Sequence, residues 1–148
     1  MEDPRPALQT ALKEAMKNKD TARRNTIRML QSAIKQVEID SQKELDAAGV
    51  VAILQKEAKK RRESISELEN AGRADQADDE KQELEIIEMF LPRQLNEEEV
   101  AVIVREVIAQ VGAETPKDTG KVMGPVMAKV KGLADGNLVS KVVREQLS

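Results

Sequence analysis

The sequence contains no cysteine, no histidine, no tryptophan and no tyrosine, and Phe90 is its one large aromatic residue. Without cysteine the chain has no disulfide, no thiol nucleophile and no thiolate-bound metal. Without histidine it lacks the commonest general base near neutral pH and the commonest metal ligand. Because only carboxylates, lysines and hydroxyls remain for chemistry, we expect no catalytic residues acting alone, no metal and no cofactor.

Hydrophobic residues make up 40% of the 148 residues and charged residues 34%, yet aromatic residues make up only 1%. A core of Leu, Ile, Val, Met and Ala suits helices packed on helices, whereas β-rich domains usually contain more aromatic residues. Long helices with charged outer faces explain the high charge content. No segment alternates polar and apolar residues over a strand's length. The composition therefore predicts an all-α protein.

No segment is long and apolar enough to span a membrane, and the N-terminal residues MEDPRPALQT lack the basic and apolar regions of a signal peptide. From this we expect no membrane association and a cytoplasmic protein. The net charge of −3 is unevenly distributed: residues 67–99 carry three basic and twelve acidic side chains, and residues 116–148 carry six and three. The C-terminal part can therefore bind an anionic partner, although the net charge of the whole chain is negative.

The spacing of apolar residues predicts seven helices, four before Pro92 and three from Asn96 onward. Asp20 and Asp46 are placed to cap the second and third helices, and Gly72 to end the third. The fourth should cover about residues 74–91, and Asn96 followed by Glu99 resembles a capping box for the fifth. We predict an N-terminal four-helix domain over residues 1–93 and a C-terminal three-helix tail domain over residues 94–148.

The sixth helix should begin with Thr115 as N-cap and Pro116 at its first position. Pro125 lies inside this helix, where it removes a backbone hydrogen bond and disfavours helical geometry at the residue before it. We therefore expect a kink or a split at Pro125. After a break at Gly132, Asp135 can cap the last helix.

One side of the sixth helix combines small residues with lysines, opposite its apolar side. This side of the sixth helix, together with two basic residues of the last helix, is a candidate docking face for tRNA or a protein. The residues of this face are Lys117, Gly120, Lys121, Gly124, Ala128, Lys131, Lys141 and Arg144. Small residues ringed by lysines allow an anionic group, or another backbone, to come close; the alternative is an ordinary solvated face. Because aromatic residues for base stacking are nearly absent, RNA would be bound through its phosphates and shape.

The third helix carries a second basic face, formed by Lys56, Lys59, Lys60 and Arg62, for which a solvated surface is the simpler interpretation. Arg61, in contrast, lies in the middle of the apolar side, where an unpaired guanidinium would be very unfavourable. We expect a structural ion pair with Glu57, one turn earlier, or with a glutamate of the fourth helix such as Glu85. The acidic clusters at 78–80 and 97–99 do not suggest metal sites, because adjacent carboxylates on a helix point about 100° apart.

Three segments carry a family resemblance: LQKEAKKRRESI (54–65), MFLPRQL (89–95) and TPKDTGKVMGPVMAKVKGLADGNLVS (115–140). Together they resemble the stand-alone YqeY proteins over nearly the whole chain. The C-terminal part also resembles the tail of the GatB subunit of the tRNA-dependent amidotransferase. The positions that fit that tail are Gly120, Gly124, Val126, Met127, Lys131, Gly132, Ala134, Asp135, Leu138 and Val139. Asp135 and Gly136 replace an Asn cap and a Pro, which is a mild departure, and Pro125 differs too.

The resemblance implies an N-terminal helical unit and a tail that, in the amidotransferase, contacts tRNA while other parts perform catalysis. The family is associated with carbon–nitrogen ligase activity that uses glutamine as amido donor, but nothing in this chain could perform that reaction alone. We therefore expect a non-catalytic tRNA-associated module, with tRNA and with amidotransferase or aminoacyl-tRNA synthesis proteins as partners. The alternatives are a helical protein-interaction adaptor, or an enzyme whose active site a partner subunit supplies.

Overall fold

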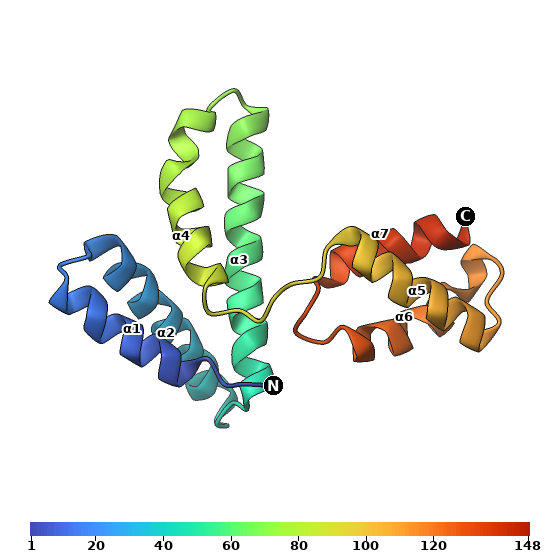
Figure 1. Cartoon of the computed structure of the whole chain (residues 1–148), viewed down its shortest axis with the longest axis horizontal. Coiled ribbons are helices and arrows are strands. Elements are labelled where there is room, and N and C mark those ends of the chain that lie inside the picture. The colour runs from blue at the N-terminus through green and yellow to red at the C-terminus, as the bar shows by residue number, and fades with distance from the viewer. The chain divides into compact units, whose positions relative to one another are not determined.

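The computed structural model describes residues 1–148 and consists of helices joined by turns, without a strand (Figure 1). The predicted all-α class is therefore confirmed. The chain forms two compact units, Met1–Leu91 and Pro92–Ser148. This division lies within two residues of the predicted domain boundary and is compatible with the predicted arrangement of four helices followed by three. None of the helices combines the length and the apolar character that crossing a membrane requires.

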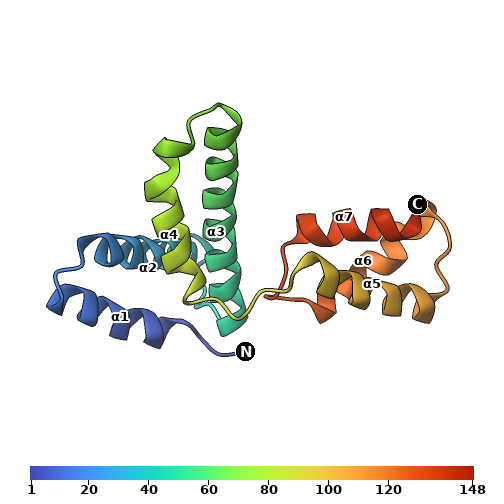
Figure 2. The ribbon, with the colours of Figure 1, turned by 45° about the horizontal axis from the view of Figure 1, so that its top comes forward.

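The first unit contains two helical hairpins (Figures 1 and 2). The first hairpin pairs α1 (Arg5–Lys17) with α2 (Thr21–Ser41), and the second pairs α3 (Ala47–Asn70) with α4 (Asp78–Glu88), which the 3-10 turn η1 (Ala74–Ala77) precedes. Helix α4 also packs on α2, so the two hairpins share one core. The side chains of this core that are fully buried are Leu8, Ile27, Leu30, Val50, Leu54, Ala58 and Ile87.

The predicted caps of this unit are present. The Asp20 carboxylate accepts a hydrogen bond from the N–H of Arg23 at 3.2 Å, and Asp46 accepts one from Gly49 at 2.8 Å. Helix α3 ends just before Gly72, whose φ of +71° is the left-handed conformation that glycine adopts most easily. Helix α4 ends at Glu88, earlier than expected, because residues 89–91 form turns before Pro92.

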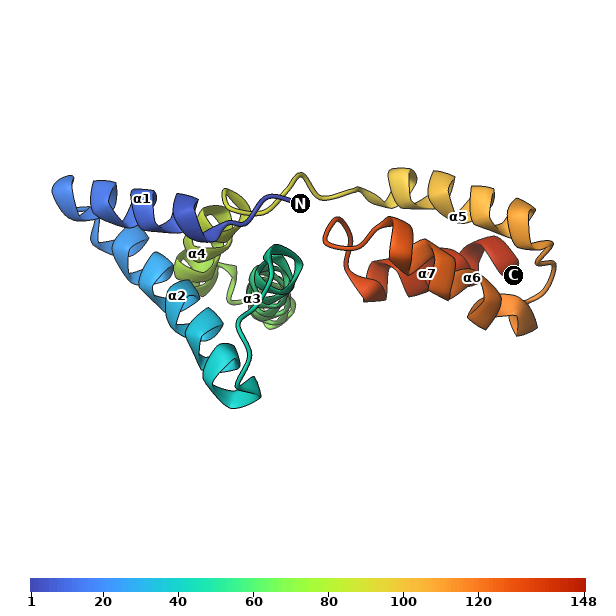
Figure 3. The ribbon, with the colours of Figure 1, turned by 90° about the horizontal axis from the view of Figure 1, so that it is seen from below.

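The second unit packs three helices around a valine-rich core: α5 (Glu97–Val111), α6 (Thr119–Lys129) and α7 (Gly136–Leu147) (Figure 3). Fully buried valines from all three helices form this core, namely Val100, Val104, Val107, Val122, Val126, Val139 and Val143, with Val130 just after α6. The capping box expected at α5 is present: the Asn96 side chain accepts from the N–H of Glu99 at 2.8 Å, and the Glu99 carboxylate accepts from the N–H of Asn96 at 3.1 Å.

The start of the predicted sixth helix is a separate 3-10 turn, η2 (Pro116–Asp118), after which α6 continues through Pro125 without a break. The expected split is therefore wrong. Pro125 removes only the hydrogen bond to the carbonyl of Lys121. Because both residues are exposed, water can bond that carbonyl in place of the missing N–H.

Candidate functional site

Helix α6 separates an apolar side from a face that is open to solvent. Val122 and Val126 are fully buried against α5 and α7, whereas Gly120, Lys121 and Gly124 are exposed. Ala128 continues the exposed face, and Lys117 and Lys131 flank it, all of them exposed. The structure thus brings together six of the eight residues of the predicted docking face, which we call the α6 face: Lys117, Gly120, Lys121, Gly124, Ala128 and Lys131.

The two glycines of the α6 face have no role in the internal packing. A Cβ atom added to Gly120 or Gly124 would meet nothing within 4 Å, and neither residue has a positive φ. In contrast, a Cβ on Gly49 would lie 3.0 Å from the Leu45 side chain. Since glycine inside a helix is about 1 kcal/mol less favourable than alanine, the fold alone would favour alanine at Gly120. At Gly124 this preference is offset, because the ring of the following Pro125 crowds a Cβ atom on the residue before it.

The lysines of the α6 face are largely free of internal partners. The Lys121 amine lies 3.7 Å from the Asp118 carboxylate, and no carboxylate lies within 4 Å of the amines of Lys117 and Lys131. Asp118 is held in place by hydrogen bonds from the N–H groups of Glu114 at 2.9 Å and Thr115 at 3.2 Å. These backbone donors, together with Lys121, lower the pKa of Asp118 below its ordinary value. The α6 face therefore offers lysines whose charge an external anion can neutralise.

The two predicted residues of α7 lie apart from this group. The Lys141 amine is 3.5 Å from the carboxylate of Glu97, in the first turn of α5, so it covers the seam between α5 and α7. The α6 face points away from both of these helices. Arg144 is exposed on α7 without a carboxylate within 4 Å.

The second predicted basic face, on α3, is partly neutralised by the chain's own carboxylates. Lys60 lies 3.5 Å from Glu57, and Arg62 lies 3.5 Å from Glu88. Lys56 is exposed and Lys59 half-buried. This pattern is typical of a solvated helix surface more than of an anion-binding patch.

Arg61 makes a network with two glutamates. Its guanidinium contacts the Glu57 carboxylate through Nη1, as expected from the sequence, and its Nε donates to Glu83 Oε2 at 2.9 Å. The partner from the fourth helix is thus Glu83 instead of Glu85, which is exposed. Glu83 precedes the buried Ile87 by one turn and so shares the side of α4 that faces the core.

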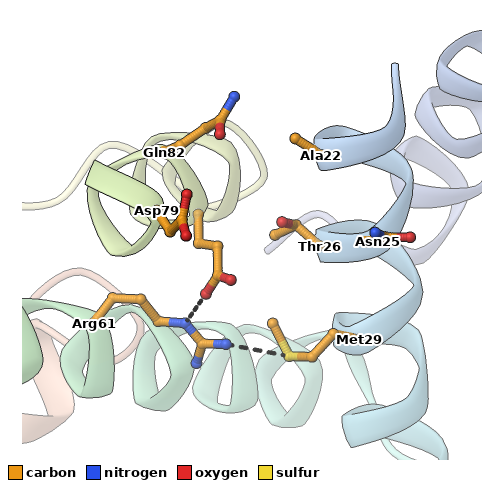
Figure 4. A pocket seen from close by; sticks show the side chains of 8 residues that line it. Ala22, Asn25, Thr26, Met29, Arg61, Asp79 and Gln82 are labelled. Carbon is orange, nitrogen blue, oxygen red and sulfur yellow. Dashed lines mark hydrogen bonds and ion pairs between the residues drawn. The ribbon is translucent and has the colours of Figure 1, made fainter. Parts of the chain in front are cut away.

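A cleft of about 250 Å³ lies beside this network, between α2 and α4 (Figure 4). Its lining residues are Ala22, Asn25, Thr26 and Met29 from α2, Arg61 from α3, and Asp79, Gln82 and Glu83 from α4. No motif in the sequence indicates this cleft, because its lining comes from three separate helices. The one available signal is Thr26, a hydroxyl residue beside Ile27 on the inward side of α2.

Comparisons with known proteins identify relatives of this chain. A family model described as "Yqey-like protein" matches residues 5–147. A protein of Lachancea thermotolerans named "Altered inheritance of mitochondria protein 41, mitochondrial" is 41% identical over 85 residues, which cover 57% of this chain and 46% of that protein. Proteins of the same name are 38% identical over 103 residues in Kluyveromyces lactis (67% of this chain, 56% of that protein) and 31% identical over 144 residues in Pyrenophora tritici-repentis (95% and 78%).

The matched part spans about half the length of the first two relatives. All of these relatives are named as mitochondrial proteins, which contradicts the prediction of a cytoplasmic protein. That prediction was wrong because it used the lack of an apolar segment, and this lack does not distinguish one aqueous compartment from another.

Proposed function

This chain belongs to the YqeY-like family, and on that premise we propose that it is a non-catalytic binding module whose α6 face docks folded tRNA. The observation that carries the proposal is the combination of exposed glycines and lysines on α6. Gly120 and Gly124, which the packing does not require, stand beside Lys117, Lys121 and Lys131, two of which have no internal carboxylate partner. Lysines neutralise phosphates, and glycines let a backbone lie directly on the helix.

The resemblance of the C-terminal part to the amidotransferase tail supports tRNA as the anionic partner. We propose that the module serves tRNA-dependent amidotransferase chemistry, or other proteins of aminoacyl-tRNA synthesis, by holding tRNA. The chain contains neither histidine nor cysteine, and its exposed lysines are suited to binding instead of catalysis. Any carbon–nitrogen ligase activity with glutamine as amido donor would therefore belong to a partner.

The test is the affinity of the purified chain for a folded tRNA transcript, measured by fluorescence anisotropy of labelled RNA over a range of salt concentrations. The triple variant Lys117→Glu, Lys121→Glu and Lys131→Glu should bind much more weakly. It should also lower the slope of log K against log salt by about 2 to 3, because each lost phosphate contact contributes about 0.7 to 0.9.

The matched control reverses three exposed lysines of the first unit, Lys13, Lys17 and Lys43, and changes the net charge equally. If the control weakens tRNA binding as much as the α6 variant does, the attraction is unspecific and the proposed face is wrong. The same conclusion follows if the α6 variant binds tRNA as tightly as the unchanged chain.

A second candidate function is a protein-interaction adaptor that accepts a partner helix on the α6 face. The open space above Gly120 and Gly124 favours it, since small residues allow two helices to approach closely. Under this alternative, Gly124→Leu removes a co-purifying protein partner, whereas reversal of the three lysines leaves that partner bound. Loss of the partner on charge reversal alone would exclude the adaptor model.

A further inference from the structure

Arg23 of α2 directs its guanidinium at the sulfur of a methionine. Its Nη2 lies 3.3 Å from the Sδ of Met89, the first residue after α4. Although Arg23 is half-buried, no carboxylate or carbonyl of the chain accepts a hydrogen bond from its guanidinium. A thioether sulfur is a weak acceptor. This guanidinium therefore lacks the strong oxygen acceptor that arginine side chains in proteins commonly bind.

Two other arginines contact methionine sulfurs, but neither depends on the sulfur. Arg61 lies 3.6 Å from Met29 and is also bonded to two carboxylates. Arg28 lies 3.8 Å from Met16 and is exposed, so water can accept from its remaining donors. Of these three arginines, Arg23 alone is both half-buried and without an oxygen acceptor from the chain.

The Met89 side chain is open to oxidants, because the residue is 59% exposed. Since the chain has no cysteine, its methionines are the only sulfur groups that a hydroperoxide can oxidise. In this reaction the terminal oxygen of the hydroperoxide is transferred to Sδ, so the O–O bond breaks and a sulfur–oxygen bond forms. The sulfur loses two electrons, and the hydroperoxide is reduced to an alcohol, or to water when it is hydrogen peroxide.

The sulfoxide oxygen would give Arg23 the acceptor that it lacks. Oxidation of methionine replaces a weak acceptor by a polar oxygen, and the Nη2 of Arg23 already faces the atom that would carry this oxygen. We propose that Met89 is a site of reversible oxidation by hydroperoxides, and that Arg23 binds the resulting sulfoxide. Methionine oxidation usually disrupts packing, whereas here it ties the turn of residues 89–91 to α2.

The turn after α4 provides a direct measure of this tie. The N–H of Phe90 donates to the carbonyl of Ile87 at 3.0 Å, and the N–H of Leu91 donates to that of Glu88 at 3.2 Å. Such amides exchange with solvent when the turn opens, so their exchange rates report how firmly it is held. A hydrogen bond from a charged group to the sulfoxide should slow the exchange of both amides about tenfold.

The test is nuclear magnetic resonance measurement of amide exchange in the full chain, before and after treatment with hydrogen peroxide. Mass spectrometry follows the oxidation, since the tryptic peptide between Lys81 and Arg93 contains Met89 as its only methionine. We expect oxidation of Met89 together with slower exchange at Phe90 and Leu91. Methionine sulfoxide reductases should restore the original exchange rates.

Variants connect the effect to the contact between Arg23 and Met89. In Arg23→Leu, which removes the donor, peroxide should no longer slow the exchange at residues 90 and 91. Met89→Leu should make these amides insensitive to peroxide. The matched control is Arg28→Leu, which changes the arginine that contacts Met16 on the same helix and should leave the slowing intact. Far-UV circular dichroism establishes that each variant is folded.

Three results would overturn the proposal. The first is a Met89 that stays reduced at a peroxide concentration that oxidises Met16, which is 52% exposed. The second is exchange at Phe90 and Leu91 that is unchanged or faster after Met89 has been oxidised. The third is an equal slowing in Arg23→Leu and in the unchanged chain, because the sulfoxide would then act without Arg23.

Discussion

The stability of the first unit should depend on the Glu57 carboxylate. The Arg61 side chain is only 16% exposed and the Glu57 side chain 11%, so their contact is shielded from water. Glu57→Gln keeps the shape of the side chain and removes its charge. The guanidinium then keeps a single carboxylate, that of Glu83, whose side chain is 41% exposed.

The expected loss follows from this geometry. Removing one partner of a buried ion pair typically destabilises a protein by about 3–5 kcal/mol, because it leaves a buried charge uncompensated. Since Glu83 still accepts from Arg61 Nε at 2.9 Å, we expect a smaller loss, about 2 kcal/mol. For a unit of this size that corresponds to a thermal midpoint lower by about 10 °C.

The chain has no tryptophan or tyrosine to report unfolding, so the assay is differential scanning calorimetry with native-state hydrogen exchange. Amides around Val50 and Leu54 report on the first unit, and amides around Val104 report on the second, which should not change. The control is Lys60→Met, which removes the exposed ion pair of the same Glu57. It should alter the unfolding free energy by less than about 0.5 kcal/mol.

A second comparison of variants separates the effect of buried charge on stability from the effect of side-chain packing. The double variant Glu57→Leu with Arg61→Leu removes both charges of the shielded contact, and water can solvate the remaining Glu83. We expect it to be at least as stable as Glu57→Gln alone, because apolar replacement of a buried pair is often neutral. The reasoning is refuted if Glu57→Gln costs no more than the Lys60→Met control, or if the double variant is the least stable of the three.

Three further predictions concern the second unit. Gly120→Ala should raise its unfolding free energy by about 0.5–1 kcal/mol, whereas Gly112→Ala should lower it because the φ there is +69°; calorimetry measures both. Asn96→Ala removes the capping box of α5 and should cost about 1 kcal/mol in denaturant unfolding. Asp118 has a folded pKa below its ordinary value of 3.8, so its contribution to stability is present above that pH and lost as the pH falls through the folded pKa. The unfolding free energy of Asp118→Asn should therefore vary less with pH below about 4, and a slope equal to that of the unchanged chain would contradict this.

Local features of the fold could be predicted from the sequence, because neighbouring residues alone determine them. Asp20, Asp46 and Asn96 cap helices that begin one residue later, and each capping bond spans three residues. The ion pair of Arg61 with Glu57 is local in the same sense, being one helical turn long. The composition, rich in aliphatic and poor in aromatic residues, was sufficient to predict the all-α fold class.

Features that depend on how helices face one another could not be predicted. The orientation of α4 against α3 determines that Glu83, and not Glu85, pairs with Arg61. Because the adjacent Ile86 and Ile87 are both buried, their spacing defines the inward side of α4 only to within about one residue. The cleft around Thr26 needs three helices at once. A kink or a split was expected at Pro125 because local geometry disfavours a helix there; the helix is not split, since the surrounding packing and solvent access outweigh that preference.

Four of the five glycines of the second unit fall into two groups, and the difference bears on what the α6 face binds. Gly112 and Gly132 have positive φ values, so the turns require them, whereas Gly120 and Gly124 are helical and have open space above them. Long lysine side chains could reach a phosphate even above alanine, so attraction of an anion does not by itself require glycine. A backbone lying directly on the helix does require it. Lysines and glycines together therefore favour an anionic backbone, as in folded RNA, over a free anion or an uncharged helix. Gly120→Ala should yield a chain that is more stable and yet binds tRNA less tightly, and damage to the fold cannot produce that combination.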